Sequence, residues 1–79
     1  MFYYPGGIAN DDMGRVFYQT TYDCFHTKEE AEDMFSFWED NYGYSFLATW
    51  IEDSNGGIHD HHVYVDSLGA IWKRKRTHD

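Results

Sequence analysis

The segment from Thr27 to Gly43 carries the signals that begin and end one amphipathic helix, and this helix constrains how the rest of the chain can fold. Thr27, followed three residues later by Glu30, forms a capping box ahead of a run of good helix formers. Gly43 supplies a left-handed stop. The apolar side chains recur at spacings of three and four and share one stripe: Ala31, Met34, Phe35, Trp38 and Tyr42. One helix with one apolar stripe must bury that stripe against another layer, so we expect a sheet beside it.

Strand-like segments lie on both sides of the predicted helix. Residues 15–25, RVFYQTTYDCF, are rich in β-branched and aromatic residues and predict a strand. Residues 44–53, 58–66 and 70–76 predict three more strands, joined by turns at Asn55-Gly56 and at residues 67–69. Pro5, in YYPGG, predicts a turn that leaves room for one short strand at residues 2–4. The predicted inner face of the 15–25 strand consists of Val16, Tyr18, Thr20, Tyr22 and Cys24.

These elements predict an α+β fold: an antiparallel sheet in the order β-α-β-β-β, with or without the extra short N-terminal strand, and one helix packed on a face. A chain of 79 residues has room for one domain, residues 1–79. Aromatic residues make up 20% of the chain, so we expect a small core built from a few large rings.

The charge of the chain is unevenly distributed. The formal net charge is −8, and residues 1–72 contain only two basic residues, Arg15 and Lys28. The remaining lysines and arginines lie in the basic tail, residues 73–79, which the sequence leaves open as an ordered final strand or a partly disordered segment. Binding to phosphates depends on Lys and Arg, so the acidic body disfavours direct contact with nucleic acid and favours a basic protein partner.

The outer side of the predicted helix is acidic. Like charges four residues apart destabilise a helix by a few tenths of a kcal/mol per pair, and no lysine is interleaved among these acids. Two interpretations are open, a solvated surface or a stripe of carboxylates about 16 Å long that binds a partner. The predicted partner-binding residues are Glu29, Glu32, Asp33, Glu39 and Asp40.

The run HDHH at residues 59–62 raises the alternative of a small metal-binding domain. On a regular strand His59 and His61 point to one side, where His26 or Cys24 could add a third ligand, and His62 points to the other. A structural zinc site needs four nitrogen or sulfur ligands, and this chain has one cysteine and no second histidine pair of recurrent spacing. We therefore expect no metal, with His59 and His61 as the candidate ligands if one is bound.

Catalytic signatures are not recognisable in the sequence. No glycine-rich phosphate loop, nucleophile elbow or spaced Cys/His pair occurs, so we expect neither enzymatic activity nor a cofactor. The single cysteine, Cys24, cannot form an intramolecular disulfide, which is typical of a cytoplasmic protein. No apolar run reaches the roughly 18–20 residues of a transmembrane helix, and the N-terminus lacks the pattern of a signal peptide, so we expect no membrane contact.

As a whole, the composition of this acidic, aromatic-rich chain resembles that of small inhibitors that phages encode against bacterial defences, the anti-CRISPR and anti-restriction proteins, some of which imitate DNA with arrays of carboxylates. The resemblance concerns composition and carries no residue roles. It implies an inhibitor that acts in the bacterial cytoplasm by occupying the nucleic-acid-binding surface of a basic protein or complex, such as a CRISPR effector.

Seven tyrosines exceed what one helix and a small sheet need for a core, which indicates a contact surface. They leave a structural homo-oligomer, for example a homodimer, as a further alternative.

Overall fold

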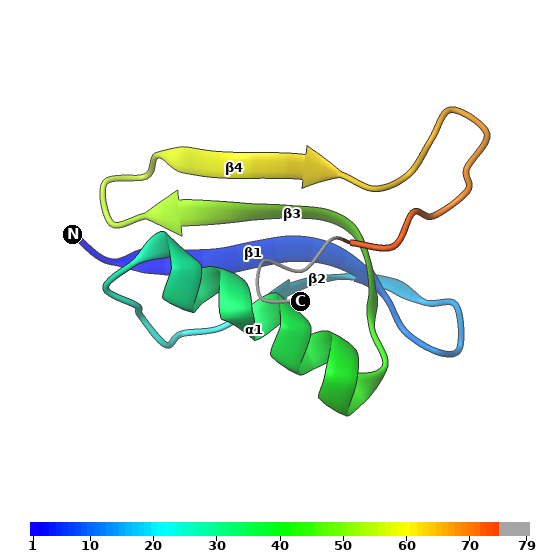
Figure 1. The fold of residues 1–79 in the computed structure, drawn as a ribbon, viewed down its shortest axis with the longest axis horizontal. Coiled ribbons are helices and arrows are strands. Elements are labelled where there is room, and N and C mark those ends of the chain that lie inside the picture. Colours follow the sequence, from blue (N-terminus) through cyan, green and yellow to red (C-terminus); the bar gives the residue numbers. More distant parts are fainter. Residues whose placement is uncertain (75–79) are drawn as a thin grey trace.

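A computed structural model, which describes residues 1–74, has an α+β fold with one helix packed on one face of a four-stranded antiparallel sheet (Figure 1). The elements follow in the order β1 (Tyr3–Asn10), β2 (Val16–Thr20), α1 (Lys28–Tyr42), β3 (Ser45–Asp53) and β4 (Ile58–Val63). The strands lie in the order β2-β1-β3-β4, and each neighbouring pair is antiparallel. The predicted fold class is confirmed. No helix within residues 1–74 has the length and apolar character needed to cross a membrane.

Strand β1 differs most from the sequence prediction, because the expected turn at YYPGG lies inside a central strand. Pro5 has no N–H to donate. The pairing of β1 with β2 ends at Gly6, one residue after Pro5 in the chain. The carbonyl of Pro5 points toward β2 and accepts a hydrogen bond from Thr20 Oγ1 at 3.0 Å. Because no ladder bond is required at this position, proline is tolerated in a strand that has neighbours on both sides.

Two glycines of β1 make room for aromatic rings on opposite faces of the sheet. A Cβ on Gly6 would lie 2.7 Å from Trp50 Nε1, and a Cβ on Gly7 would lie 3.1 Å from the Phe46 ring and 2.8 Å from the Ala48 carbonyl oxygen. Both glycines are therefore required by close packing rather than by a turn.

The helix ends are those the sequence predicts. The backbone N–H of Glu30 donates to Thr27 Oγ1 at 3.1 Å, and Gly43 has a left-handed φ of 70°. Four of the five stripe residues pack on the sheet, whereas Tyr42 is exposed because the last turn of α1 extends beyond the strands (Figure 1). The buried core is small, and three of its six residues are aromatic: Ala9, Ala31, Phe35, Trp38, Phe46 and Ile51.

Three loops share one construction, which the sequence encodes as Asp-x-x-Gly-x. In each loop the aspartate Oδ1 accepts the backbone N–H groups two and four residues later, and the glycine three residues later has a φ between 82° and 86°. These aspartates are Asp11, Asp53 and Asp66. The turn expected at Asn55-Gly56 is one of the three loops, and it joins β3 to β4.

Hydrogen bonds to a carboxylate stabilise its charged form, so the pKa of each of these aspartates is lowered from the ordinary value of 3.8. For Asp11 and Asp66 the largest cause is the bond from the backbone of Arg15 and of Ala70, respectively. For Asp53 the largest cause is the side chain of His59. The loops therefore depend on ionised aspartates.

The faces of β2 are reversed relative to the sequence prediction. Phe17 packs against the core and contacts Tyr44, with ring centroids 4.9 Å apart, while Val16 and Tyr18 lie on the other face of the sheet. The alternation in this strand is ambiguous because both faces carry large apolar residues, and register with β1 decides between them. The strand also ends at Thr20 rather than at Phe25, which forms an isolated bridge with Tyr3.

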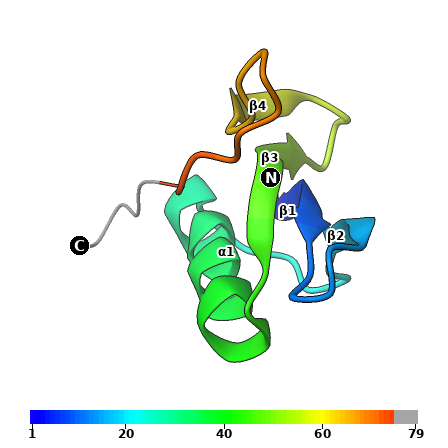
Figure 2. The same ribbon diagram turned by 90° about the vertical axis from the view of Figure 1, so that its right-hand side faces the viewer.

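The prediction of a last strand at residues 70–76 is wrong for residues 70–74, which form no strand. Residues 75 and 76 lie outside the described residues. Ile71 forms a single bridge with Val65, and Trp72 N–H donates to the Tyr64 carbonyl. The chain then leaves the sheet and crosses to α1, on the same side of the sheet as the helix (Figures 1 and 2). Of the basic tail, Lys73 and Arg74 are described, and Arg74 is buried.

Candidate protein-binding surface

The five predicted acidic residues of α1 separate into two groups. Glu29, Asp33 and Asp40 are exposed, and their spacings of four and seven residues place them in one row on the side of α1 opposite the buried stripe. We call these three residues the acidic row. With a rise of about 1.5 Å per residue, the row is roughly 16 Å long.

Glu39 has a different role from the one predicted, because it forms an internal ion pair. Arg74 donates from Nη2 and Nε to the two Glu39 carboxylate oxygens at 2.9 and 3.2 Å, and Nη2 also donates to Ser36 Oγ at 2.7 Å. The guanidinium lies 5.6 Å from the centroid of the Phe35 ring. The returning chain covers this flank of the helix, so Glu39 lies apart from the acidic row, and its role in binding a partner stays a prediction.

Glu32 lies on the same flank and is partly buried. Burial raises the pKa of Tyr64, and the charges of Glu32 and Glu39 raise it further, while the hydrogen bond from Thr49 and the charge of Arg74 lower it. Glu32 therefore lies near enough to Tyr64 for its charge to raise the Tyr64 pKa, on the flank of α1 that carries Glu39.

Phe37 is a surface residue that the sequence analysis missed. Its side chain is 47% exposed, and it lies four residues after Asp33 and three before Asp40, so it borders the acidic row. The Phe37 ring contacts Tyr42 at a centroid distance of 6.0 Å, and Tyr42 contacts Tyr44 at 5.5 Å. Phe37 is the only large apolar residue of the helix outside the predicted stripe, which is the signal that could have identified it.

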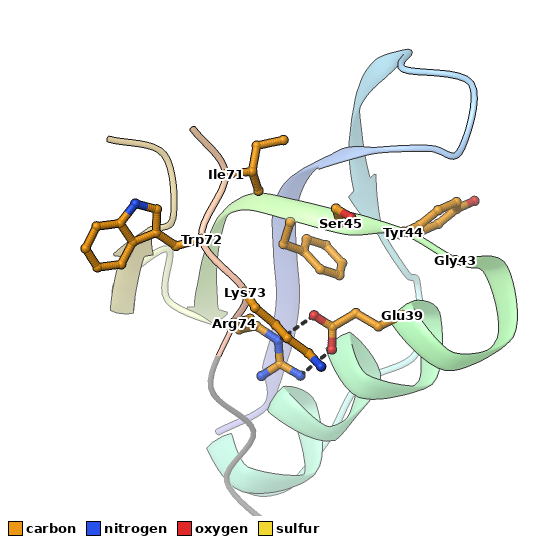
Figure 3. Close-up of a pocket in the computed structure, with 9 residues that line it drawn as sticks. Glu39, Gly43, Tyr44, Ser45, Ile71, Trp72, Lys73 and Arg74 are labelled. Carbon is orange, nitrogen blue, oxygen red and sulfur yellow. Dashed lines mark hydrogen bonds and ion pairs between the residues drawn. The ribbon is translucent and has the colours of Figure 1, made fainter. Parts of the chain in front are cut away.

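A hollow of about 430 Å³ lies between the end of α1, the start of β3 and residues 71–74. Figure 3 shows Lys73 and Arg74 extending from the C-terminal segment toward Glu39 on the helix. The residues that line the hollow are Glu39, Gly43, Tyr44, Ser45, Phe46, Ile71, Trp72, Lys73 and Arg74. The hollow is large enough to receive an aromatic side chain from a partner.

The structure does not bring His59 and His61 together. Asp60 has a left-handed φ of 54°, and the pairing of β3 with β4 shifts register between Thr49 and Ile51, which is the geometry of a β-bulge. The bulge places His61 against Trp50, on the face without the helix. His59 Nε2 instead lies 2.6 Å from Asp53 Oδ2. Within residues 1–74, no three His, Cys, Asp or Glu side chains form a group that could hold a metal ion.

Comparisons with protein-family models, with curated protein sequences and with solved structures found no match to this chain. The candidate surface is therefore defined by its own geometry: the acidic row, Phe37 at its border, and the hollow at the C-terminal end of α1.

Proposed function

We propose that this protein is a small acidic inhibitor that binds a basic, nucleic-acid-handling protein and occupies its nucleic-acid-binding surface. The observation that supports the proposal is the acidic row, three exposed carboxylates on one side of a helix that has no basic residue after Lys28. A CRISPR effector or a restriction enzyme has a binding surface of the required charge, and such an inhibitor would act in the cytoplasm of a bacterial host.

The acidic row and the aromatic residues have separate tasks in this proposal. Carboxylates along the helix attract a positively charged groove over several ångströms and accelerate association, and this effect weakens as salt screens it. Phe37 provides apolar contact area next to the carboxylates, where an aromatic side chain is favoured as an anchor because it orders few torsions.

The experiment is a pull-down from bacterial lysate with the tagged protein at low and at moderate salt, followed by mass spectrometry. The expected result is a nucleic-acid-binding protein that is captured at low salt and depleted at higher salt. The captured protein is then tested for competition between this chain and its nucleic acid.

Two double variants distinguish the contribution of the acidic row to binding from the contribution of net charge. Asp33→Lys with Asp40→Lys removes most of the row, and Asp12→Lys with Asp23→Lys makes the same change in net charge at exposed loop positions. We expect the first variant to bind the captured partner at least about tenfold more weakly, a loss of about 1.4 kcal/mol. Equal affinities of the two variants, or a partner that nucleic acid does not displace, would contradict the proposal.

A further inference from the structure

The sheet has one face that no described element covers. α1 and residues 71–74 lie on the opposite side of the sheet, as the two perpendicular views show (Figures 1 and 2). Side chains alternate along strands, so the strand pairing places the following residues on this face, which we call the open face: Tyr4, Ile8, Asn10, Val16, Tyr18, Thr20, Ala48, Trp50, Glu52, Ile58, His61 and Val63.

The open face is apolar and nearly uncharged, in contrast to the acidic helix. Val16, Tyr18, Ile58 and Val63 are more than half exposed. Glu52 is the one acidic or strongly basic residue among those that the strands place on this face, and its carboxylate accepts a hydrogen bond from Trp50 Nε1 at 3.0 Å. Exposed apolar side chains gathered on one uncovered face of a small protein mark an interaction site.

We propose that the open face is the interface of a homodimer, in which two copies of the sheet pack face to face. Two copies of a chain with net charge −8 repel each other, and the repulsion is smallest where the facing surfaces carry few charges. A basic partner is attracted instead to the acidic row, on the other side of the molecule. A second copy therefore matches the charge of the open face better than a basic partner does.

The size of the open face is sufficient for a modest dimer interface. Four strands about 4.8 Å apart and roughly six residues long, at about 3.3 Å per residue, cover a flat area of roughly 400 Å². Both copies contribute to the buried area, and projecting side chains make the accessible surface larger than the flat area. Two copies would therefore bury on the order of 1,000 Å² in total, near the lower limit for a specific interface. We therefore expect dissociation in the micromolar range.

This dimer would place both helices on the outside. Packed sheets lie about 10 Å apart, so the layers would run helix, sheet, sheet, helix, with an acidic row on each outer surface. The dimer does not depend on the proposed inhibition, but it would double the acidic surface that a basic partner meets.

The test measures the mass of the full chain by sedimentation equilibrium from low to high micromolar concentration. A reducing agent is present throughout, because the exposed Cys24 could otherwise cross-link two copies. We expect a monomer of 9.4 kDa to convert to twice that mass, and to do so at lower protein concentration when salt is raised. Binding to a basic partner has the opposite dependence on salt, so a failure of one proposal is distinguishable from a failure of the other.

Val63→Lys places a charge on the open face, on the edge strand β4, and we expect it to weaken the dimer at least about tenfold. Leu68→Lys is the matched control, because Leu68 is 92% exposed in the loop after β4 and is not among the residues that the strand pairing places on the open face. Far-ultraviolet circular dichroism checks that both variants fold, and Val16→Lys repeats the test on the opposite edge of the sheet if Val63→Lys does not fold.

Three outcomes would overturn the proposal: a wild-type monomer at all concentrations, a dimer that withstands the substitutions on the open face, or a dimer that Leu68→Lys weakens equally. The first outcome can be observed with the wild-type protein alone.

Discussion

The buried ion pair of Arg74 with Glu39 yields the sharpest prediction about stability, because the chain contains a second pair of the same length that differs in burial. Both pairs have a nitrogen–oxygen distance of 2.9 Å. The side chains of Arg74 and Glu39 are 2% and 13% exposed, whereas those of Arg15 and Asp11 are 75% and 14% exposed, so the two pairs differ in the burial of the arginine. The perturbation is Arg74→Met, which keeps an apolar stem near Phe35 and removes the charge.

Removing one partner of a buried pair typically costs about 3–5 kcal/mol, because the other charge stays buried without compensation. Here Arg74 lies outside any helix or strand, so water reaches Glu39 more readily after the substitution than it would in a core, and we expect a cost below that range, about 2–3 kcal/mol. For a domain of this size 1 kcal/mol corresponds to about 4–8 °C, and the thermal midpoint should fall by about 10–20 °C. Arg15→Met removes an exposed cation, and Asp11 keeps its hydrogen bonds from the backbone of Met13 and of residue 15, so this variant should lower the thermal midpoint much less.

The assay is thermal and urea denaturation of both variants at neutral pH. Addition of Glu39→Gln to Arg74→Met should cost less than the sum of the two single changes, because both act on one pair. The reasoning would be refuted if Arg74→Met lowered the midpoint no more than Arg15→Met, since burial would then contribute nothing.

Two further predictions concern the loops and the central strand. The pKa of each loop aspartate (Asp11, Asp53 and Asp66) is lowered by folding, so their stabilisation is present above about pH 4 and is lost as pH falls through the folded pKa values. The difference in urea midpoint between wild type and the triple Asp→Asn variant should shrink as pH falls from neutral to about 2, and a constant difference would contradict this. Gly7→Ala should cost about 2 kcal/mol or more, because its Cβ would meet the Ala48 carbonyl oxygen at 2.8 Å and the backbone must shift. A denaturation midpoint of Gly7→Ala equal to that of wild type would show that the strand adapts at no cost.

Local signals were sufficient for the helix. The Thr27 and Glu30 capping box, the apolar stripe and the Gly43 stop each act within a few residues of sequence, and the structure contains all three apart from the exposure of Tyr42. The turn at Asn55-Gly56 likewise depends on residues that are close together in the sequence. The Asp-x-x-Gly pattern occurs four times in the sequence: three occurrences are the loops, and the fourth, from Asp40 to Gly43, is the end of α1.

Strand β1 could not be predicted from its own residues. Pro5, Gly6 and Gly7 favour a turn when only neighbours in sequence are considered. They form a central strand because aromatic rings from β3 pack over the glycines and because pairing with β2 stops beside the proline. These conditions come from β2 and β3, and the aromatic residues of β3 lie about forty positions later in the chain, so no local pattern reports them.

The candidate surface was predicted in part. Helix periodicity placed Glu29, Asp33 and Asp40 on the outer side of α1, and the structure agrees. The separation of Glu39 from that row depends on Arg74, 35 residues later in the chain, and the separation of His59 from His61 depends on a bulge at Asp60.

The sequence by itself therefore determined the helix with its two ends, the α+β class, and the acidic outer side of α1, because each follows from residue spacing and turn chemistry within a short segment. Only the tertiary structure decided the strand order, the inner face of β2, the internal pairing of Glu39, and the presence of an uncovered apolar face on the sheet. Each of these depends on which distant segments pair and pack together. The free energy of that choice is shared among many contacts between elements rather than encoded in any one stretch of the chain.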